Sequence, residues 1–201
     1  MTTAPTYKSK KATGCINMHY AVVTITDGVA SFDEIRRLYD VEEINITDKY
    51  AEGENYADNK KNMYRKRVTG ADIGVTLSHL LKYDEAALTG KNYQDGELET
   101  TTTDIQKSVA LLYEKTYDDG SSDRIVYYNC GLSKDDNNIK TEGENFEFTG
   151  DTLAGKAIPL PNGKVKYEIA SDEIGEKTEV KTKFDNFFKS VQFLGVADPT
   201  V

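Results

Sequence analysis

The residue types best suited to nucleophilic or metal chemistry are scarce in this chain, which has two histidines and two cysteines in 201 residues. Cys15 and His19 stand four residues apart and could supply half of a metal site, but no second pair of ligands lies near them in the sequence. We therefore interpret their proximity as chance and expect no bound metal. His79 follows an alternating apolar pattern and is expected at the surface or at an interface.

Motifs that accompany known catalytic mechanisms are also missing from the sequence. It contains no Gly-x-Ser-x-Gly elbow, phosphate-binding loop, dinucleotide fingerprint or His-Glu-x-x-His pair. The acidic runs at Asp118-Asp119 and Asp135-Asp136 lack the twelve-residue pattern of a calcium loop, so we interpret them as turns. The sequence predicts no catalytic residues, no cofactor-binding residues and no metal ligands, and hence a protein that is not an enzyme.

The two cysteines and the N-terminal sequence bear on the cellular compartment. Cys15 and Cys130 could pair, but two scattered cysteines are no disulfide framework, and free thiols in a reducing cytoplasm are the better interpretation. Residues 1–11 lack the apolar stretch of a secretion signal. No run of about 18 apolar residues occurs anywhere in the chain. We expect the protein to be made and matured in the cytoplasm.

Composition narrows the class of partner. The formal net charge is −9 and the pI is about 4.8. An acidic surface repels the phosphate backbone, which argues against a nucleic-acid-binding protein. A conduit through which DNA passes without sticking would also be acidic, so the charge is compatible with that role. The aromatic residues are mostly tyrosine, thirteen in all, and tyrosine and threonine favour pleated, half-exposed β structure.

Alternating apolar residues predict most of the chain as strands. The expected extended segments are 20–26, 44–47, 68–77, 107–117, 124–132, 152–160 and 165–169. The pair 107–117 and 124–132 is joined by an Asp-Gly turn and carries apolar residues on both faces of each strand. This pattern predicts a hairpin buried on both sides. Phe146 and Phe148 also alternate with polar residues.

Three segments have helical features. Ser31-Phe-Asp-Glu34 is a capping box that predicts a short helix, although an extended conformation is nearly as well supported. Leu80–Leu88 predicts a short helix that stops at Gly90. A C-terminal stripe repeats with helical spacing and predicts a helix packed on the sheet, formed by Val180, Phe184, Phe187, Phe188 and Val191.

Polar, charged stretches separate these elements and are predicted to be loops, namely 50–62, 91–104 and 134–144. No repeat or linker divides the chain, so we expect a single domain over residues 1–201, with a flexible basic arm at 1–13 and a loose tail at 195–201. Six to eight strands, one short central helix and one C-terminal helix define an α+β protein that is mainly antiparallel β.

Several segments, in order, resemble the phi13-type major tail proteins of long-tailed bacteriophages of Gram-positive bacteria. The resembling segments are Tyr56-Ala-Asp-Asn59, 68–77, 83–90, Ser108-Val-Ala-Leu-Leu112, 141–157, Gly163-Lys164 and Tyr167. The strongest is 141–157, which is similar to the family's segment with Gly-Glu, Phe, Thr and Leu-x-Gly-x-Ala. The sequence departs from the family by lacking a proline before Ser108 and by placing a capping box at Ser31, where an extended stretch is expected.

The resemblance implies a β-sandwich or small barrel with flanking helices, whose subunits form rings, typically hexamers, that stack into the tail tube of the virion. The implied partners are other copies of the chain, the tape measure protein and other tail proteins, with viral DNA passing through the lumen without specific binding and no contact with membranes. The polar segments 50–62 and 91–104 become candidates for ring-to-ring contacts. The alternatives are a β-sandwich module that binds a host surface or carbohydrate, and a head–tail connector or tail terminator ring.

Overall fold

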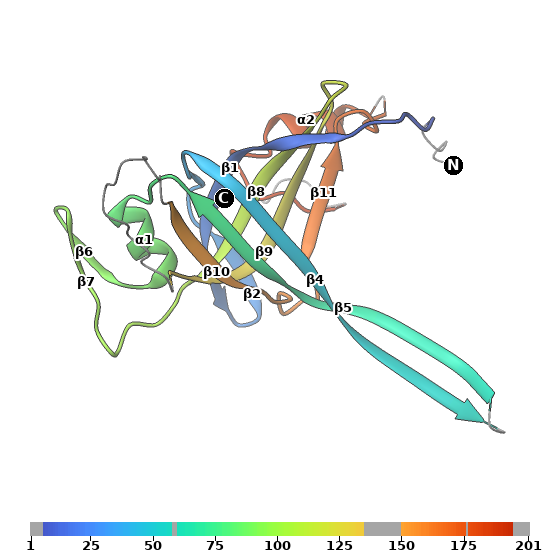
Figure 1. Cartoon of the computed structure of the whole chain (residues 1–201), viewed down its shortest axis with the longest axis horizontal. Coiled ribbons are helices and arrows are strands. Elements are labelled where there is room, and N and C mark those ends of the chain that lie inside the picture. The colour runs from blue at the N-terminus through green and yellow to red at the C-terminus, as the bar shows by residue number, and fades with distance from the viewer. Residues whose placement is uncertain (1–5, 58–59, 135–149, 176, 195–201) are drawn as a thin grey trace, which may run out of the picture.

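A computed structural model describes residues 6–57, 60–134, 150–175 and 177–194 and contains mostly antiparallel β structure with two short helices (Figure 1). This confirms the predicted α+β, mainly antiparallel class. The strands are β1 (Ala12–Thr26), β2 (Val29–Phe32), β3 (Arg36–Arg37), β4 (Val41–Ala57), β5 (Lys60–Leu77), β6 (Asn92–Gln94), β7 (Glu97–Glu99), β8 (Ser108–Tyr117), β9 (Ser122–Ser133), β10 (Asp151–Ala157) and β11 (Lys166–Ala170). The helices are α1 (Lys82–Thr89) and α2 (Thr178–Asp185).

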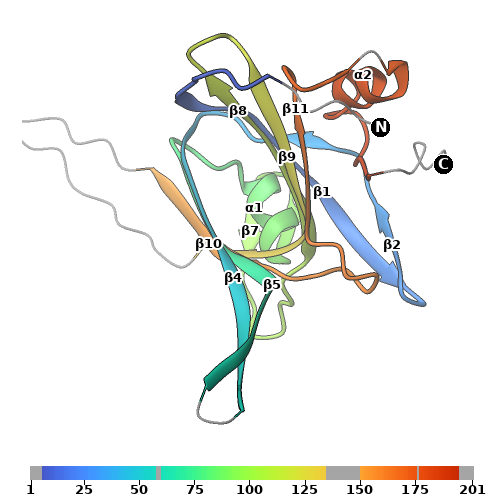
Figure 2. The ribbon, with the colours of Figure 1, turned by 90° about the vertical axis from the view of Figure 1, so that its right-hand side faces the viewer.

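Nine strands form one continuous sheet in the order β2-β1-β8-β9-β10-β5-β4, with β3 beside β1 and β11 beside β9. The sheet forks at β9, because β11 pairs with its first half and β10 with its last four residues. Register shifts interrupt the β1–β8 and β8–β9 pairs, and such bulges increase the bend of a sheet. The result is a strongly curved sheet, seen from two directions in Figures 1 and 2.

The first core involves both ends of the curved sheet, since it joins β1 and β8 to β5 and β10 and is covered by α1. Its buried members include Met18, Tyr20, Ile73, Val75, Leu77, Leu80, Leu88, Leu111, Leu132 and Leu153. The second core lies on the opposite face of β1, β8 and β9. It includes Val23, Ala110, Leu112, Val126, Tyr128, Leu160, Ile169, Phe187 and Val191. Alternate residues of β8 and β9 therefore point into different cores, which confirms the hairpin predicted to be buried on both sides.

Helix α1 confirms the prediction for Leu80–Leu88 to within two residues. It ends at Gly90, whose φ of 77° is left-handed and whose N–H donates to the carbonyl of Ala86. A methyl group added there would lie 1.9 Å from the carbonyl oxygen of Ile105. Glycine is thus required at this position both by its conformation and by the close approach of a second backbone segment.

The helical prediction at Ser31 is wrong. The segment forms β2, which pairs with β1 across the Asp27-Gly28 turn, and β3 follows at Arg36–Arg37. The extended conformation is favoured over the capped helix because pairing with β1 also places Phe32 and Ile35 against the second core. The extended alternative describes the segment correctly.

The largest correction concerns 50–62, which was predicted to be a loop. Residues 50–57 and 60–62 belong to β4 and β5, whose antiparallel pairing runs from Val41↔Leu77 to Ala57↔Lys60. The predicted loop 91–104 also contains a small hairpin, β6–β7. Of the charged loop predicted at 134–144 only Lys134 is described, and Phe146 and Phe148 lie outside the described residues.

Both predicted ends also need correction. Helix α2 ends at Asp185, so Phe187 and Phe188 follow it in a turn and Val191 lies in an irregular segment, although Phe187 and Val191 are buried as predicted. The expected arm 1–13 is shorter than predicted, because β1 begins at Ala12 and the ammonium group of Lys10 pairs with Asp172 at 2.9 Å. The expected loose tail, 195–201, lies outside the described residues.

Candidate assembly surface

Strands β4 and β5 extend well beyond the rest of the sheet. Strand β5 pairs with β10 over Ala71–Leu77, so among the described strands residues 60–68 have only β4 as a neighbour in the sheet. We call residues 50–57 of β4 with 60–68 of β5 the ribbon, which projects from the body in Figures 1 and 2. A two-stranded hairpin without a packed face is marginally stable in water. The ribbon is therefore a feature that gains stability when another surface covers it.

The root of the ribbon is held firmly to the body. Asp48 accepts a hydrogen bond from the Tyr127 hydroxyl at 3.0 Å and pairs with Lys166 at 3.2 Å. Beside it, the ammonium group of Lys49 lies 2.6 Å from the carboxylate of Asp72. These contacts fix the direction in which the ribbon leaves the body.

One face of the ribbon is tyrosine-bearing. The cross-strand register places Tyr50 opposite Val68, Glu52 opposite Lys66 and residue 54 opposite Tyr64, all on the same side. Lys66 pairs with Glu52 at 2.8 Å and lies over the Tyr50 ring. Tyr50 and Tyr64 are 45% and 48% exposed. Aromatic side chains of this exposure are common in protein interfaces.

The other face, which we call the arginine face, has a different chemistry. Arg67 lies opposite Ala51 and Arg65 opposite Gly53, with Met63 next along β5. Small residues opposite the arginines leave them without a cross-strand carboxylate. Within the described residues neither guanidinium has an ion-pair partner, and both side chains are exposed.

The outer edge of β4 is the second open feature of this region. Strand β4 ends the order of the sheet, and the described residues supply no strand on its other side. Its seventeen residues therefore present a row of backbone donors and acceptors. An edge of this length is a template for pairing with another chain.

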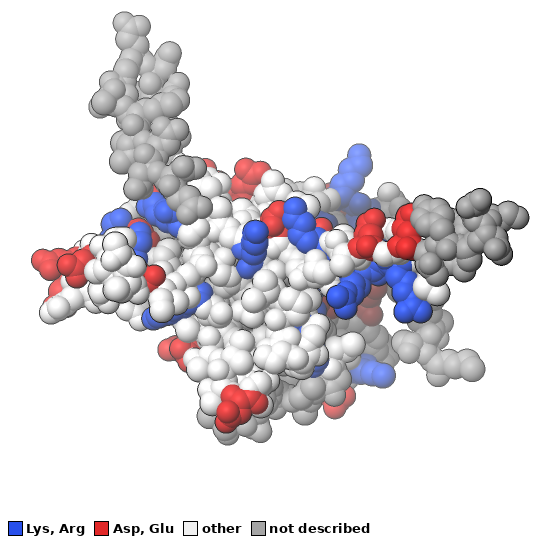
Figure 3. Space-filling model, turned by 90° about the horizontal axis from the view of Figure 1, so that it is seen from below, with Lys and Arg blue, Asp and Glu red and all other residues white. Residues whose placement is uncertain are grey.

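Charge is distributed unevenly along the molecule. Residues 50–68 contain five basic and three acidic residues, which give this segment a net charge of +2. Because the whole chain has a net charge of −9, the residues outside this segment carry a net charge of −11. Figure 3 shows acidic as well as basic side chains both on the ribbon and at the opposite, β6–β7 end.

The β6–β7 hairpin sits on α1, which is anchored by buried ion pairs. The carboxylate of Glu85 is almost fully buried and contacts the ammonium groups of Lys91 at 2.8 Å, Lys82 at 3.1 Å and Lys134 at 3.6 Å. Lys134 continues to Asp151 at 2.6 Å. Burial by itself raises the pKa of Glu85, but the three lysines outweigh it and the net pKa is lowered.

A second buried carboxylate ties α1 to β1. Asp84 accepts a hydrogen bond from the Tyr20 hydroxyl at 2.8 Å and lies 3.5 Å from the guanidinium of Arg36. Burial and this hydrogen bond raise the pKa of Tyr20. Both carboxylates are engaged by fixed cations or donors, so they hold the helix in place.

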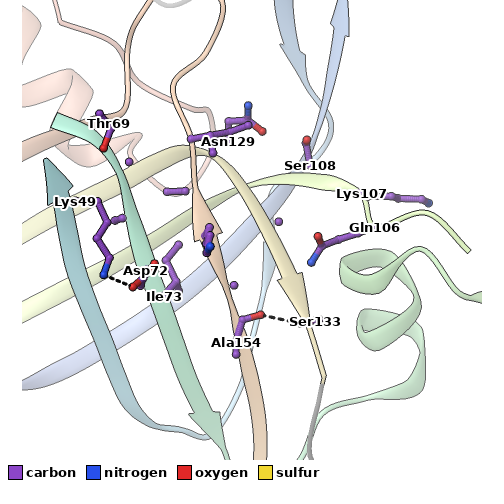
Figure 4. A pocket seen from close by; sticks show the side chains of 17 residues that line it. Lys49, Thr69, Asp72, Ile73, Gln106, Lys107, Ser108, Asn129, Ser133 and Ala154 are labelled. Carbon is purple, nitrogen blue, oxygen red and sulfur yellow. Dashed lines mark hydrogen bonds and ion pairs between the residues drawn. The ribbon is translucent and has the colours of Figure 1, made fainter. Parts of the chain in front are cut away.

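A shallow groove of about 1030 Å³ crosses β10 between β5 and β9 (Figure 4). Its floor is made of small residues such as Gly131, Ala154 and Gly155. Among the described residues that line it there is no histidine or cysteine, and its one carboxylate, Asp72, is paired with Lys49. Within the described lining, no serine or threonine hydroxyl therefore has a histidine beside it as a base.

The residues first considered for chemistry are not brought together. His19 stacks on Phe188 and its Nδ1 donates to the carbonyl of Asn17 at 2.7 Å, while burial lowers its pKa. Cys15 is half-buried and Cys130 fully buried, and both are free thiols. Within the described part of the chain, no group of three or more histidine, cysteine or acidic residues could hold a metal.

Helices in the described ranges are too short or too polar for a bilayer span. His79 is exposed at the surface and lies 4.0 Å from Asp151.

Sequence reasoning missed the ribbon because its strands lack apolar alternation. The usable signal was charge pairing: Glu52 and Lys66 are opposite charges that sit across from each other when 50–57 folds back on 60–68.

Comparison with known protein families and with curated proteins gives no match to this sequence.

Proposed function

We propose that this protein is a structural subunit that assembles with copies of itself into stacked rings, forming the hollow tail tube of a long-tailed bacteriophage. In this proposal it resides in the virion tail, contacts the tape measure and other tail proteins, and conducts DNA without binding it specifically. The sequence resemblance supplies the tail-tube assignment. The structural support is for self-association.

The observation that carries the proposal is the ribbon. It leaves the body, exposes Tyr50, Tyr64 and Met63, and shares with the rest of β4 an edge that no described strand covers. An isolated soluble domain has little reason to keep such a feature, because long open edges favour aggregation. In a regular assembly the same edge and the same side chains become buried contacts.

Charge supports a conduit. Outside residues 50–68 the chain carries −11, so copies arranged with acidic surfaces inward would repel the DNA backbone. Five of the 25 basic residues lie within residues 50–68, where they would lie at contacts between copies.

A carbohydrate-binding or host-binding module is the second candidate, and one observation favours it. Tyr50 and Tyr64 project from one face of the ribbon with a Glu52–Lys66 pair between them, a combination of aromatic and polar groups that suits a sugar. This candidate predicts a monomer that binds glycans, while a connector or terminator predicts one closed ring.

Electron microscopy of the purified full chain, from about 1 μM upward, tests the proposal directly, with sedimentation velocity as the solution measurement. We expect rings and tubes of uniform diameter. Single rings that never stack would favour the connector or terminator. A protein that stays monomeric, alone and with co-expressed tape measure protein, would refute self-assembly, and a glycan array would then test the second candidate.

A further inference from the structure

The two ends of the molecule carry complementary pairs of charges. At one end, Arg65 and Arg67 lie on the arginine face of the ribbon. At the other end, Glu97 and Glu99 lie on one side of β7, opposite the uncharged Gln94 and Asn92. All four charged side chains are exposed, and none has an ion-pair partner within the described residues.

The spacing of the two pairs also matches. Residues i and i+2 of a strand point to the same side about 7 Å apart, and this applies equally to the arginines of β5 and the glutamates of β7. Residues 92–104 contain four acidic residues and no basic one. The opposite face of β6–β7 turns toward α1, where Tyr93 packs edge-on against Tyr83, so the glutamates face outward.

A contact within one molecule is excluded by the arrangement. The ribbon and the β6–β7 hairpin project from opposite ends of the longest axis (Figures 1 and 3), and both are attached to the same body. The arginine face can therefore meet Glu97 and Glu99 only on another copy.

We propose that Arg65 and Arg67 of one copy dock on Glu97 and Glu99 of the next, joining copies head to tail. This inference rests on the proposed self-assembly and names the surfaces that perform it. The two surfaces differ, so the contact is heterologous. It closes a ring where the rotation between copies closes, and otherwise leaves one free ribbon and one free acidic hairpin at the ends of a row. In either case successive copies point the same way.

Gly53 and Ala51 fit this contact. They lie directly opposite Arg65 and Arg67, and a Cβ atom added at Gly53 meets nothing within 4 Å. The low relief of β4 lets the two hairpins approach face to face, so that the guanidinium groups reach the carboxylates.

Charge reversal and charge exchange test the inference. The variant R65E/R67E and the variant E97R/E99R should each weaken self-association about tenfold, since attraction at two pairs becomes repulsion. The combined four-residue variant restores opposite charges across the contact and keeps the wild-type net charge. Its association should return to within about threefold of wild type. The control K177E/K189E changes net charge as much as R65E/R67E does but lies near α2, and it should associate like wild type.

Sedimentation velocity at low and high salt gives the readout, with circular dichroism and the melting temperature confirming that each variant is folded. Two results would overturn this inference and leave the proposed function standing, provided that the wild-type chain assembles. The first is that both double variants associate as strongly as the wild type. The second is that the four-residue variant folds but does not recover association. A wild-type chain that never self-associates would overturn both.

Discussion

The region around α1 and the ribbon are both rich in charge, yet they use it in opposite ways. Around α1, Glu85 and Lys134 are almost fully buried and pair with each other and with further partners. In the ribbon, Arg65 and Arg67 are exposed and unpaired within the described residues. Both regions contain several ionic groups. Around α1 the body supplies opposite charges that contact them, whereas the described part of the body supplies none for Arg65 and Arg67.

This difference separates residues that maintain the fold from residues available for contacts. Buried pairs stabilise only when every partner is present, because removing one leaves an uncompensated charge. Exposed charges add little to stability, commonly less than about 1 kcal/mol. Substitutions should therefore affect folding around α1 and affect association in the ribbon.

The largest expected effect is in the first core. Leu111 is fully buried between the curved strands, and Leu111→Ala should lower the free energy of unfolding by about 2–5 kcal/mol, through lost transfer energy and the cavity left behind. Met63→Ala in the ribbon is the control and should change it by less than about 0.5 kcal/mol. Urea unfolding measures both under conditions where the protein is monomeric. Equal losses would contradict the division between body and ribbon.

Removing the central carboxylate of the α1 ion pairs should have the next largest effect. Glu85→Gln keeps the shape but leaves Lys82 and Lys91 without their counter-charge and Lys134 with Asp151 alone. It should lower the free energy of unfolding by about 2–3 kcal/mol at neutral pH. Glu97→Gln, an exposed glutamate nearby, is the matched control and should have no measurable effect on unfolding. An equal effect of both would show that the buried pairs stabilise no more than surface charges.

The effect of Glu85→Gln should depend on pH. The pKa of Glu85 is lowered in the folded protein relative to its ordinary value of 4.5. The carboxylate therefore contributes fully above pH 4.5, and its contribution is lost as the pH falls through the lower pKa of the folded state. Urea unfolding at neutral pH and at about pH 3 should show the difference between wild type and variant shrinking in acid. A constant difference would exclude ionised Glu85 as its source.

A smaller loss is expected where α1 ends. Gly90→Ala introduces a methyl group against the backbone oxygen of Ile105 in a left-handed conformation, and should lower the free energy of unfolding by about 1–2 kcal/mol. Gly74→Ala in β5 is the matched control, because its methyl group meets only ordinary contacts at 3.8 Å or more. Thermal unfolding of both variants would show a shift for Gly90→Ala alone. Equal melting temperatures would mean that Gly90 is not strained by a side chain.

The body could be predicted from the sequence largely because its signals are local. The apolar alternation of 107–117 and 124–132 and the Asp-Gly turn between them define β8 and β9 without any knowledge of the rest. Gly90 marks the end of α1 in the same way. The pairing of Glu85 with Lys134 could not be predicted, because Lys134 lies far along the chain and only the packing of α1 beside β9 brings the two together.

The ribbon could not be predicted because its sequence has no apolar periodicity of the kind that marks a strand packed on a core. Residues 50–57 and 60–67 carry charged side chains on both faces of the hairpin, and apolar periodicity reveals a strand only where one face is buried. Its backbone pairing continues that of strands 41–49 and 69–77, with a register shift between Lys49 and Tyr50 where the ribbon begins. From its sequence alone, a segment of this kind is predicted to be a loop. Its tyrosines and arginines nevertheless make it the candidate contact surface.

The smallest expected effect on folding is at Gly53, and it distinguishes the two regions most sharply. Gly53→Val adds a β-branched side chain to an open strand position, where nothing lies within 4 Å. The free energy of unfolding of the monomer should therefore change by less than about 0.5 kcal/mol. In the head-to-tail contact the same side chain would stand between Arg65 and the glutamates of the next copy and weaken association. Sedimentation velocity and urea unfolding on the same samples separate the outcomes, because a variant that associates like wild type would mean that this side of the ribbon faces solvent in the assembly as it does in the monomer.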